Sequence, residues 1–368
     1  MNGLKTVVLL GAGATRGALK GFHMGGTTVI VPINADFLPV AQRFASAKGK
    51  KSLRDKVVRL KNFIYNELGE RKSRTPPMEE IFSILYSSKD FMEIYKKKKG
   101  RKAAYLREIQ DFFGLLGAIF REVETYAYQQ QKTNFYKNLA KLVEDGDTII
   151  SLNYDTLMDK ALVEQGWNPK RGYGADFNHK LRAFQNTKKS NRFKDLVLLK
   201  LHGSFNWFVR KKQREDLDVL FRKKPSLVIN PAKFGWNEKK GYLRQIIPPI
   251  YGKFFAHNFW KDLWTLAFDR LVSCDCLIVI GCSLAETDFH LRAFLGRAKV
   301  IRRKAKRPFK RVLVVDPDKK QQPQKRFKLI LMGCKLKFES LSTFERFVKQ
   351  YEKSLKNNNS KGESVYVR

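Results

Sequence analysis

The chain has 368 residues, which is enough for one large domain or two smaller ones with a substantial core. A hydrophobic share of 43% and an aromatic share of 12% exclude a disordered protein, and no apolar run reaches the length of a membrane span. The net charge is +38, from 73 Lys and Arg against 35 Asp and Glu. This excess favours a polyanion or an acidic protein as partner, with a well-solvated surface as the alternative.

The first element is the apolar run Val7–Leu10, which ends at Gly11-Ala12-Gly13. A buried parallel strand that enters a glycine loop has this pattern. The run is too short for a signal peptide, so we expect a strand in a cytoplasmic protein. Glycines let the backbone approach a ligand, and a following helix directs N–H groups at a phosphate. The match to G-x-G-x-x-G is incomplete, because Arg16 stands at the third place, and an ordinary strand-to-loop turn is the alternative.

The next segment is helical from about Val40 to Tyr128, and we predict a helical insertion at about residues 40–130. Asp36, just before it, is expected to cap a helix or to reach the ligand of the glycine loop. Seven apolar residues alternate steps of four and three, which predicts one buried helical face, with a seam between copies in a homo-oligomer as the alternative. They are Tyr105, Ile109, Phe112, Leu116, Ile119, Val123 and Tyr126.

Strands and helices alternate in the rest of the chain, which favours a doubly wound parallel sheet. The predicted strands are Thr148–Leu152, Leu196–Leu201, Ser226–Asn230, Cys276–Ile280 and a last one, Val312–Val315. The predicted helices are Leu157–Gln165, a helix with the apolar stripe Phe255 to Leu271, and one capped by Thr287 that ends at Ala298. We expect one domain at 1–354, followed by a polar, disordered tail at 355–368.

Small or polar residues follow five of these strands. They are Gly11 to Thr15, Asn153 and Asp155, His202, Gly281 and Ser283, and Asp316. In doubly wound sheets ligands bind outside the carboxyl ends of the strands, so these residues are predicted to converge on one site.

The residue types at these ends suit a nucleotide. Asp316 suits the hydroxyls of an adenosine ribose, and the glycines with Ser283 suit a pyrophosphate. His202 can act as a general base near neutral pH, and Asn153 can fix a water or a ribose hydroxyl. Each of three residues also has a structural alternative. Asp155 would cap its helix, Asn153 would only form the hydrogen bonds that a strand end needs, and His202 would have a structural role.

The four cysteines, Cys274, Cys276, Cys282 and Cys334, form no C-x-x-C pair. Neither a zinc ribbon nor a disulfide framework is indicated, and we expect buried free thiols and no metal.

Four motifs in order resemble the sirtuin-like NAD-binding domain, a Rossmann-like fold of the silent information regulator type. They are Gly11-Ala12-Gly13, Leu152-Asn153-Tyr154-Asp155, Leu201-His202-Gly203-Ser204 and Gly281-Cys282-Ser283-Leu284. Within this family the chain looks most like bacterial proteins of antiphage defence, over about residues 4–350.

This resemblance implies NAD as ligand, His202 as catalytic base and Asn153 as the residue that orients the water or the ribose. Asp155 would lie near the nicotinamide end. The implied NAD-binding set is Gly11, Ala12, Gly13, Thr15, Asp36, Asp155, Gly281, Ser283 and Asp316.

The chain departs from the protein-deacylating sirtuins, which bind a structural zinc through two cysteine pairs. The defence branch implies an NAD glycohydrolase that releases nicotinamide and ADP-ribose and depletes the cell's NAD. A deacylase or ADP-ribosyltransferase is the enzyme alternative, and a non-catalytic sensor of an NAD derivative that binds nucleic acid is the second. The basic clusters are predicted to dock nucleic acid or a partner ATPase. They are Lys96 to Lys102, Arg210 to Arg214, Arg302 to Arg311 and Lys319 to Lys328.

Overall fold

The chain divides into two compact units. The first, the sheet unit, comprises Met1–Ala18, Thr133–Ile247 and Gly252–Arg368, and the described part of the second, the helical unit, lies within Leu19–Lys132. The computed structural model describes residues 5–67, 69, 71, 73–97, 106–130, 134–177, 180–181, 192–210, 224–228, 242–246, 258–286, 288–332, 337–341 and 346–348.

The sheet unit is built on a six-stranded sheet in the order β12-β11-β10-β1-β4-β6, with all neighbours parallel. Its strands are β1 (Thr6–Leu10), β4 (Thr148–Ser151), β6 (Val197–Lys200), β10 (Cys276–Ile280), β11 (Arg311–Val315) and β12 (Lys337–Leu341). The central strands are buried on both faces, as expected for near-continuous apolar runs. The chain runs outward from β1 through β4 and β6, then returns to β10 on the other side of β1, so the order reverses between β1 and β10.

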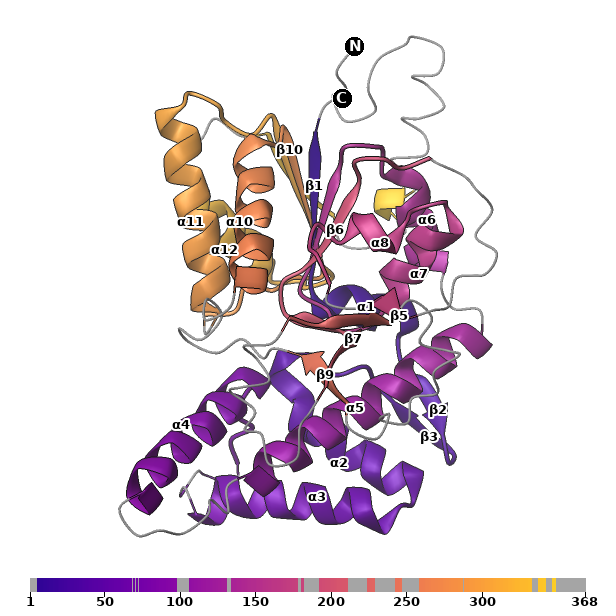
Figure 1. Ribbon diagram of the computed structural model, residues 1–368, viewed down its shortest axis with the longest axis vertical. Coiled ribbons are helices and arrows are strands. Elements are labelled where there is room, and N and C mark those ends of the chain that lie inside the picture. The colour runs from indigo at the N-terminus through magenta and orange to yellow at the C-terminus, as the bar shows by residue number, and fades with distance from the viewer. Residues whose placement is uncertain are drawn as a thin grey trace. The chain divides into compact units, whose positions relative to one another are not determined.

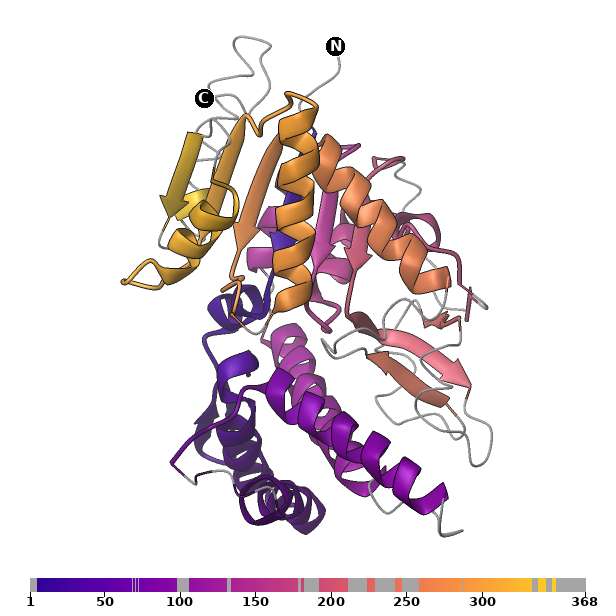
Figure 2. The same cartoon turned by 90° about the vertical axis from the view of Figure 1, so that its left-hand side faces the viewer.

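Helices cover both faces of this sheet. Figure 1 shows α10, α11 and α12 on one side and α6 and α7 on the other, and Figure 2 shows α10 and α11 crossing in front of the strands. The bounds are α1 (Ala12–Leu19), α6 (Asn134–Leu142), α7 (Leu157–Glu164), α8 (Pro169–Gly172), α10 (Asn258–Ser273), α11 (Phe289–Lys304) and α12 (Gln322–Ile330). The predicted fold class, a doubly wound Rossmann-like α/β sheet, is confirmed.

A second, four-stranded sheet in the sheet unit has the order β5-β8-β7-β9. Its strands are β5 (Lys180–Leu181), β7 (Gly203–Arg210), β8 (Ser226–Val228) and β9 (Tyr242–Ile246). Because β7 begins directly after His202, this histidine lies where the chain passes from one sheet to the other.

The helical unit contains a hairpin and a group of helices. Its elements are β2 (Phe22–Met24), β3 (Thr27–Val29), the 3-10 helix η1 (Asn34–Asp36), α2 (Phe37–Lys48), α3 (Lys51–Asn62), the π-helix η2 (Phe63–Glu67), α4 (Met78–Lys97) and α5 (Leu106–Gln129). Five members of the predicted stripe, from Ile109 to Val123, are fully buried in α5 and form core, while Tyr105 lies outside the described residues. None of the helices described in either unit is both long enough and apolar enough to cross a membrane.

Three details of the sheet unit differ from the sequence predictions. The cap of α11 is Asp288, whose side chain accepts a hydrogen bond from the Leu291 N–H at 3.0 Å, while Thr287 lies outside the described residues. The same helix continues past Ala298 to Lys304. Val312–Val315 is not the last strand, because β12 pairs with β11; the sequence of β12, with Glu339 and Ser340 adjacent, contains no apolar run. The predicted domain boundaries stay a prediction, and the tail from 355 lies outside the described residues.

Two turns meet through glycine backbones at the point where the strand order reverses. The Gly13 N–H donates to the Gly281 carbonyl at 2.9 Å, and the Gly11 N–H donates to the Ile280 carbonyl at 3.0 Å. A Cβ on Gly11 would lie 2.5 Å from the Gly281 oxygen, and one on Gly281 would lie 2.1 Å from the Ala14 nitrogen. Gly281 also has φ +61°, which side chains disfavour. This contact therefore requires glycine on both sides.

We predict that Gly281→Ala lowers the free energy of unfolding by about 2–5 kcal/mol, because the new Cβ meets backbone and φ stays positive. Gly296→Ala is the matched control: Gly296 lies inside α11 and its Cβ would meet nothing within 4 Å, so a gain of about 0.5–1 kcal/mol is expected. Urea denaturation of the three proteins measures both effects. A Gly281→Ala protein as stable as the parent would contradict the tight contact.

Candidate active site

The carboxyl ends of β10, β1, β4 and β6 lie at one level. In the parallel register Leu10 pairs with both Ile280 and Ser151, and Ser151 pairs with Lys200. The ladder continues one residue further, since the Leu152 N–H donates to the Leu10 carbonyl at 2.9 Å and the Leu201 N–H to the Ser151 carbonyl at 3.1 Å. The loops that follow these strands therefore leave the sheet at the same edge.

Asn153 and His202 lie side by side at this edge. Each comes two residues after the last paired residue of its strand, Ser151 in β4 and Lys200 in β6. Neighbouring strands of a sheet lie roughly 4.8 Å apart, so the loops start close together. The Phe205 N–H donates to the Tyr154 carbonyl at 2.9 Å, which keeps them together beyond the sheet.

The Thr15 hydroxyl connects α1 to the residues that follow β4. Its Oγ1 lies 2.8 Å from Asp155 Oδ2, 3.2 Å from Asn153 Nδ2 and 2.6 Å from the Tyr136 hydroxyl. All four side chains are buried, with Thr15 and Tyr136 at 1% exposure. We refer to Thr15, Tyr136, Asn153 and Asp155 as the Thr15 cluster.

The direction of these hydrogen bonds follows from the groups themselves. A hydroxyl has one proton, and Thr15 gives it to the carboxylate of Asp155, which can only accept when it is ionised. Asn153 must then present its Nδ2 donor to Thr15, and its Oδ1 has no hydrogen-bond partner among the described residues. A buried acceptor without a partner is costly in a protein interior. Asn153 Oδ1 is therefore the buried atom of the cluster that lacks a hydrogen-bond partner among the described residues.

Burial shapes the titration of two members of the Thr15 cluster. The pKa of Asp155 is raised by burial, against the opposing effects of the Lys200 ammonium and the Thr15 hydrogen bond. The pKa of Tyr136 is raised well above its ordinary value by burial and by the negative charge of Asp155, so this hydroxyl stays protonated.

His202 is buried, with 7% of its surface exposed. Burial and then the nearby His290 lower the pKa of His202 to about 4, although a hydrogen bond with the backbone of Leu152 works in the opposite direction. The imidazole contacts aromatic rings on two sides, Tyr154 at 6.4 Å and Trp264 at 6.5 Å between ring centroids. At neutral pH the ring is therefore uncharged and can accept a proton.

The predicted phosphate-binding residues lie at the same edge, in the turns after β1 and β10. Gly11, Gly13 and Gly281 meet one another, and the N–H groups of Gly11 and Gly13 are used in that contact. Ala12 begins α1 and is half-buried, and Ser283 is exposed. Contact of these residues with a pyrophosphate stays a prediction, and the structural alternative for the glycines has direct support.

Asp316 follows β11 at this edge, and its Oδ1 accepts a hydrogen bond from the Asp318 N–H at 3.0 Å. Burial raises the pKa of its carboxyl group. Asp36 lies in the helical unit, where its Oδ1 accepts the Ile33 N–H at 2.9 Å. It occupies the cap position of α2 without a side-chain hydrogen bond to that helix.

Sequence analysis missed three residues around this edge. Tyr136 lies on the buried face of α6 with apolar neighbours, so its pattern was that of core. Lys200 had a signal, since a charged residue within the apolar run Leu196–Leu201 must be paired if the strand is buried. Asp159 follows Asp155 by one helical turn, and its carboxylate lies 3.2 Å from Lys200 Nζ.

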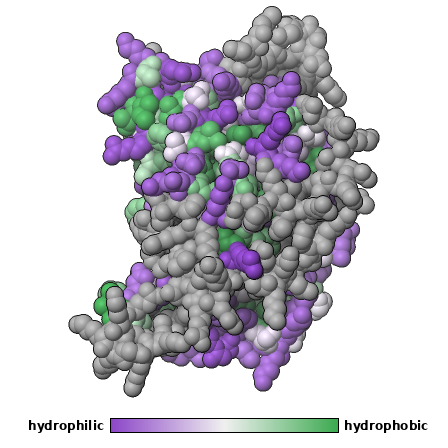
Figure 3. All heavy atoms as spheres, viewed as in Figure 1, coloured by the Kyte–Doolittle hydropathy of each residue, from purple (hydrophilic) through white to green (hydrophobic). Residues whose placement is uncertain are grey.

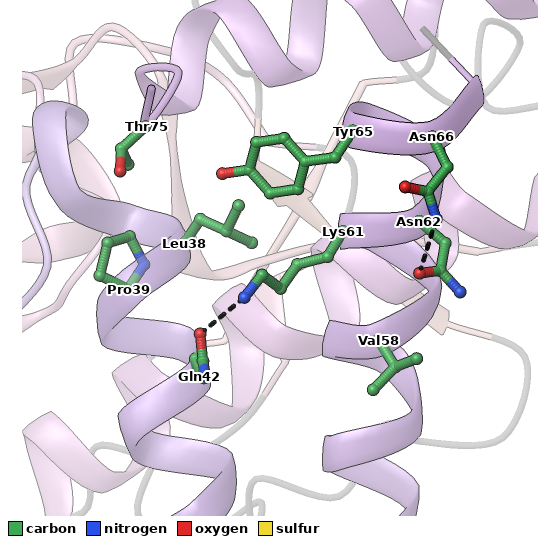
Figure 4. Close-up of a pocket in the computed structure, with 9 residues that line it drawn as sticks. All are labelled: Leu38, Pro39, Gln42, Val58, Lys61, Asn62, Tyr65, Asn66 and Thr75. Carbon is green, nitrogen blue, oxygen red and sulfur yellow. Dashed lines mark hydrogen bonds between the residues drawn. The ribbon is translucent and has the colours of Figure 1, made fainter. Parts of the chain in front are cut away.

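Elsewhere, the helical unit has a hollow of about 430 Å³ between α2 and α3, drawn in Figure 4. Lys61 crosses it to donate to Gln42 Oε1 at 2.9 Å, and no predicted site residue lines it. Across the described part of the chain, no three His, Cys, Asp or Glu side chains are grouped to hold a metal ion.

Solved structures of Sir2 proteins match the chain at low identity. A structure from work on the mechanism and regulation of Sir2 enzymes is 14% identical, with a TM-score of 0.32, over 62% of this chain and 72% of that one. A Sir2 homologue in complex with NAD is 13% identical, with a TM-score of 0.34, over 67% of this chain and 75% of that one. No curated protein sequence matches the chain significantly.

The profile of one protein family, described as the SIR2-like domain, matches residues 147–337. This range begins at β4 and includes Asn153, Asp155, His202 and Gly281. Because the match covers more than half of the 368 residues, the chain belongs to the SIR2-like domain family.

Proposed function

We propose that this protein is an NAD glycohydrolase, which cleaves NAD to nicotinamide and ADP-ribose. Membership of the SIR2-like family supports NAD as the substrate. The observation that carries the proposal is the pair formed by the buried, unpaired Asn153 Oδ1 and the neutral, buried His202 on adjacent strand ends.

The reaction needs two things that these residues can supply. The bond between ribose C1′ and the nicotinamide nitrogen breaks, its electron pair leaves with nicotinamide, and positive charge develops on the ribose. The carboxylate of Asp155 can stabilise that charge in a site of low dielectric. Water then attacks C1′ and loses a proton, which His202 can accept, while Asn153 Oδ1 can orient the water or a ribose hydroxyl.

Water as the acceptor is favoured over an acyl-lysine peptide by the cysteine pattern. The deacylating sirtuins hold a structural zinc with two cysteine pairs, and this chain has four cysteines without a C-x-x-C pair. Three of them, Cys274, Cys276 and Cys282, are buried thiols in or next to β10. Depletion of NAD in antiphage defence is the role that we propose for the activity.

We predict that His202→Ala lowers the turnover of NAD by about 10²–10⁴-fold, the range typical of a lost general base. Asn153→Ala is expected to lower it comparably, because the unpaired acceptor is removed while Thr15 keeps two other partners. Release of nicotinamide from NAD by the purified proteins measures both effects, and unfolding midpoints check the fold. His23→Ala, at an exposed histidine of the helical unit, is the matched control and should turn over NAD as the parent does.

Two outcomes would overturn the proposal. Consumption of an acetyl-lysine peptide in step with NAD, while NAD alone stays intact, would favour a deacylase. Turnover by His202→Ala within a few-fold of the parent would make this histidine structural.

The buried His202 also predicts how stability depends on pH. Its pKa is about 4 in the folded protein, against an ordinary value of 6.5. Between these values the unfolded chain binds a proton that the folded chain does not, so stability is full above about pH 6.5 and falls by at most roughly 3 kcal/mol toward pH 4. Urea unfolding from pH 7.5 to 4.5 should show a shallower decline for His202→Gln than for the parent or for His23→Gln. Parallel curves for all three would contradict a neutral, buried His202.

A second candidate function, binding of nucleic acid, is favoured by the exposed cations at the end of α11. Arg303, Lys304, Lys306 and Arg307 are exposed, and none forms an ion pair with another described residue. Figure 3 shows hydrophilic side chains gathered at its upper left, around the upper end of α11 in Figure 1. Arg302 is the exception in this cluster.

Arg302 was predicted as part of the basic surface, and this is wrong. It is 2% exposed, its guanidinium donates to the carbonyls of Leu271 and Val272 at the end of α10, and it lies 3.8 Å from the centre of the Phe309 ring. A guanidinium there satisfies helix-end carbonyls and stacks on an aromatic face, so Arg302 is structural. The clusters at Lys96–Lys102 and Arg210–Arg214 lie largely outside the described residues.

We predict that Arg303→Gln, Lys304→Gln and Arg307→Gln together weaken binding of duplex DNA at least tenfold at low salt, because each lost phosphate contact removes a counterion-release gain. Fluorescence titrations at two salt concentrations measure this. The control is Lys50→Gln, Lys51→Gln and Arg54→Gln, an equal charge change at exposed residues of the helical unit. No binding by the parent, or equal loss in both variants, would leave the charge as a solvated surface; selective capture of an acidic protein would point to a protein partner.

A further inference from the structure

A fully buried lysine lies at the end of β6, two residues before His202. Lys200 is 1% exposed, and its Nζ donates to the backbone carbonyl of Asp155 and to Asp159 Oδ2, the latter at 3.2 Å. A buried ammonium is retained only when charge and hydrogen bonds compensate for lost water, and these two acceptors provide both.

Asp159 connects this ammonium to a second layer of polar groups. The Tyr173 hydroxyl donates to Asp159 Oδ1, and the Asn206 amide donates to the Tyr173 oxygen at 2.8 Å. Burial and the charge of Asp159 raise the pKa of Tyr173 well above its ordinary value, so Tyr173 remains a donor. The chain of contacts therefore joins β6, α7, the end of α8 and β7.

One acceptor of the Lys200 ammonium, the Asp155 carbonyl, belongs to the loop between β4 and α7. This loop carries Asn153 and Asp155, and Lys200 leads directly to His202. The backbone contacts that join the two segments, such as Phe205 N–H to the Tyr154 carbonyl, do not reach Asp155. The Lys200 side chain contacts the Asp155 carbonyl and so joins β6 to the part of the loop that the backbone contacts do not reach.

We infer that Lys200 is a positioning residue, whose ammonium, held by Asp159, fixes the Asn153–Asp155 loop against the strand end that carries His202. The inference rests on the proposed function for its effect on turnover, but not for its effect on the loop. Lys200 also adds charge to the arrangement, since it lowers the pKa of Asp155 against the effect of burial. Thr15, the Leu157 N–H and Asp159 are the other groups that act on that carboxylate.

The test removes the ion pair without leaving one charge behind. Lys200→Met alone would leave Asp159 buried without its cation, a change that can unfold the chain. In Lys200→Met with Asp159→Asn the pair becomes neutral, and the asparagine oxygen still accepts from Tyr173. The matched control is Lys48→Met with Glu122→Gln in the helical unit, an ion pair whose charged atoms are 2.5 Å apart.

Two measurements apply to the parent and both double variants, under conditions where all are folded by their unfolding midpoints. Hydrogen–deuterium exchange over residues 153–156 should be roughly tenfold faster without Lys200, because the loop opens locally, while exchange in β10 stays unchanged. The kcat for NAD should fall by about 10²-fold with KM within a few-fold, since misplaced groups lose transition-state geometry more than ground-state binding. The control should match the parent in both.

The outcomes separate the two proposals. Equal exchange in the parent and the Lys200 variant overturns the positioning role, whatever the turnover. Faster exchange with unchanged kcat overturns its relevance to the reaction. If the parent itself cleaves no NAD, the proposed function fails, and exchange alone then decides whether Lys200 holds the loop.

Discussion

The contact between the Gly11–Gly13 turn and Gly281 determines where α1 begins, and the polar cluster depends on it. The Gly13 N–H to Gly281 carbonyl hydrogen bond extends the pairing of β1 and β10 beyond the sheet, and the missing Cβ atoms let the two backbones touch. Since α1 starts at this contact, Thr15 is carried to the end of β4, where it meets Asp155 and Asn153. A glycine pattern that looks like a ligand loop is thus first a condition for packing two turns at the point where the strand order reverses.

The position of Thr15 and its single hydroxyl proton determine the directions of the hydrogen bonds in the Thr15 cluster. Asp155 accepts the Thr15 proton, Thr15 therefore accepts from Asn153, and the buried Asn153 Oδ1 is left without a partner among the described residues. The arrangement is stable only if Asp155 remains ionised despite its burial. Lys200 opposes the rise in the pKa of Asp155. This lysine of β6 is therefore linked to the orientation of the Asn153 amide in the loop after β4.

Sequence reasoning succeeded where one physical rule acted alone. The apolar runs of β1, β4, β6 and β10 had to be buried strands, and parallel strands must end at a common edge, so the convergence of Asn153 and His202 was predictable. It failed where a partner distant in sequence decided the outcome. Arg302 differs from its exposed neighbours because its guanidinium donates to a carbonyl at the end of α10, a contact that the local sequence does not reveal. Tyr136 differs from an ordinary core residue because its hydroxyl contacts Thr15, which is also distant in sequence. The edge strand β12 was missed because its sequence, Lys337-Phe338-Glu339-Ser340-Leu341, contains no apolar run.

Charge accounting at the strand ends links the buried histidine to the proposed chemistry. Lys200 contacts both Asp155 and Asp159, and a neutral His202 adds no further positive charge beside them. A pKa of about 4 keeps His202 neutral throughout the physiological range. An imidazolium would add positive charge and oppose positive charge on a ribose at the same edge. The burial that makes His202 a weak base therefore also keeps its positive charge away from the edge at which we propose that an oxocarbenium-like transition state forms, in a chain whose net charge is +38.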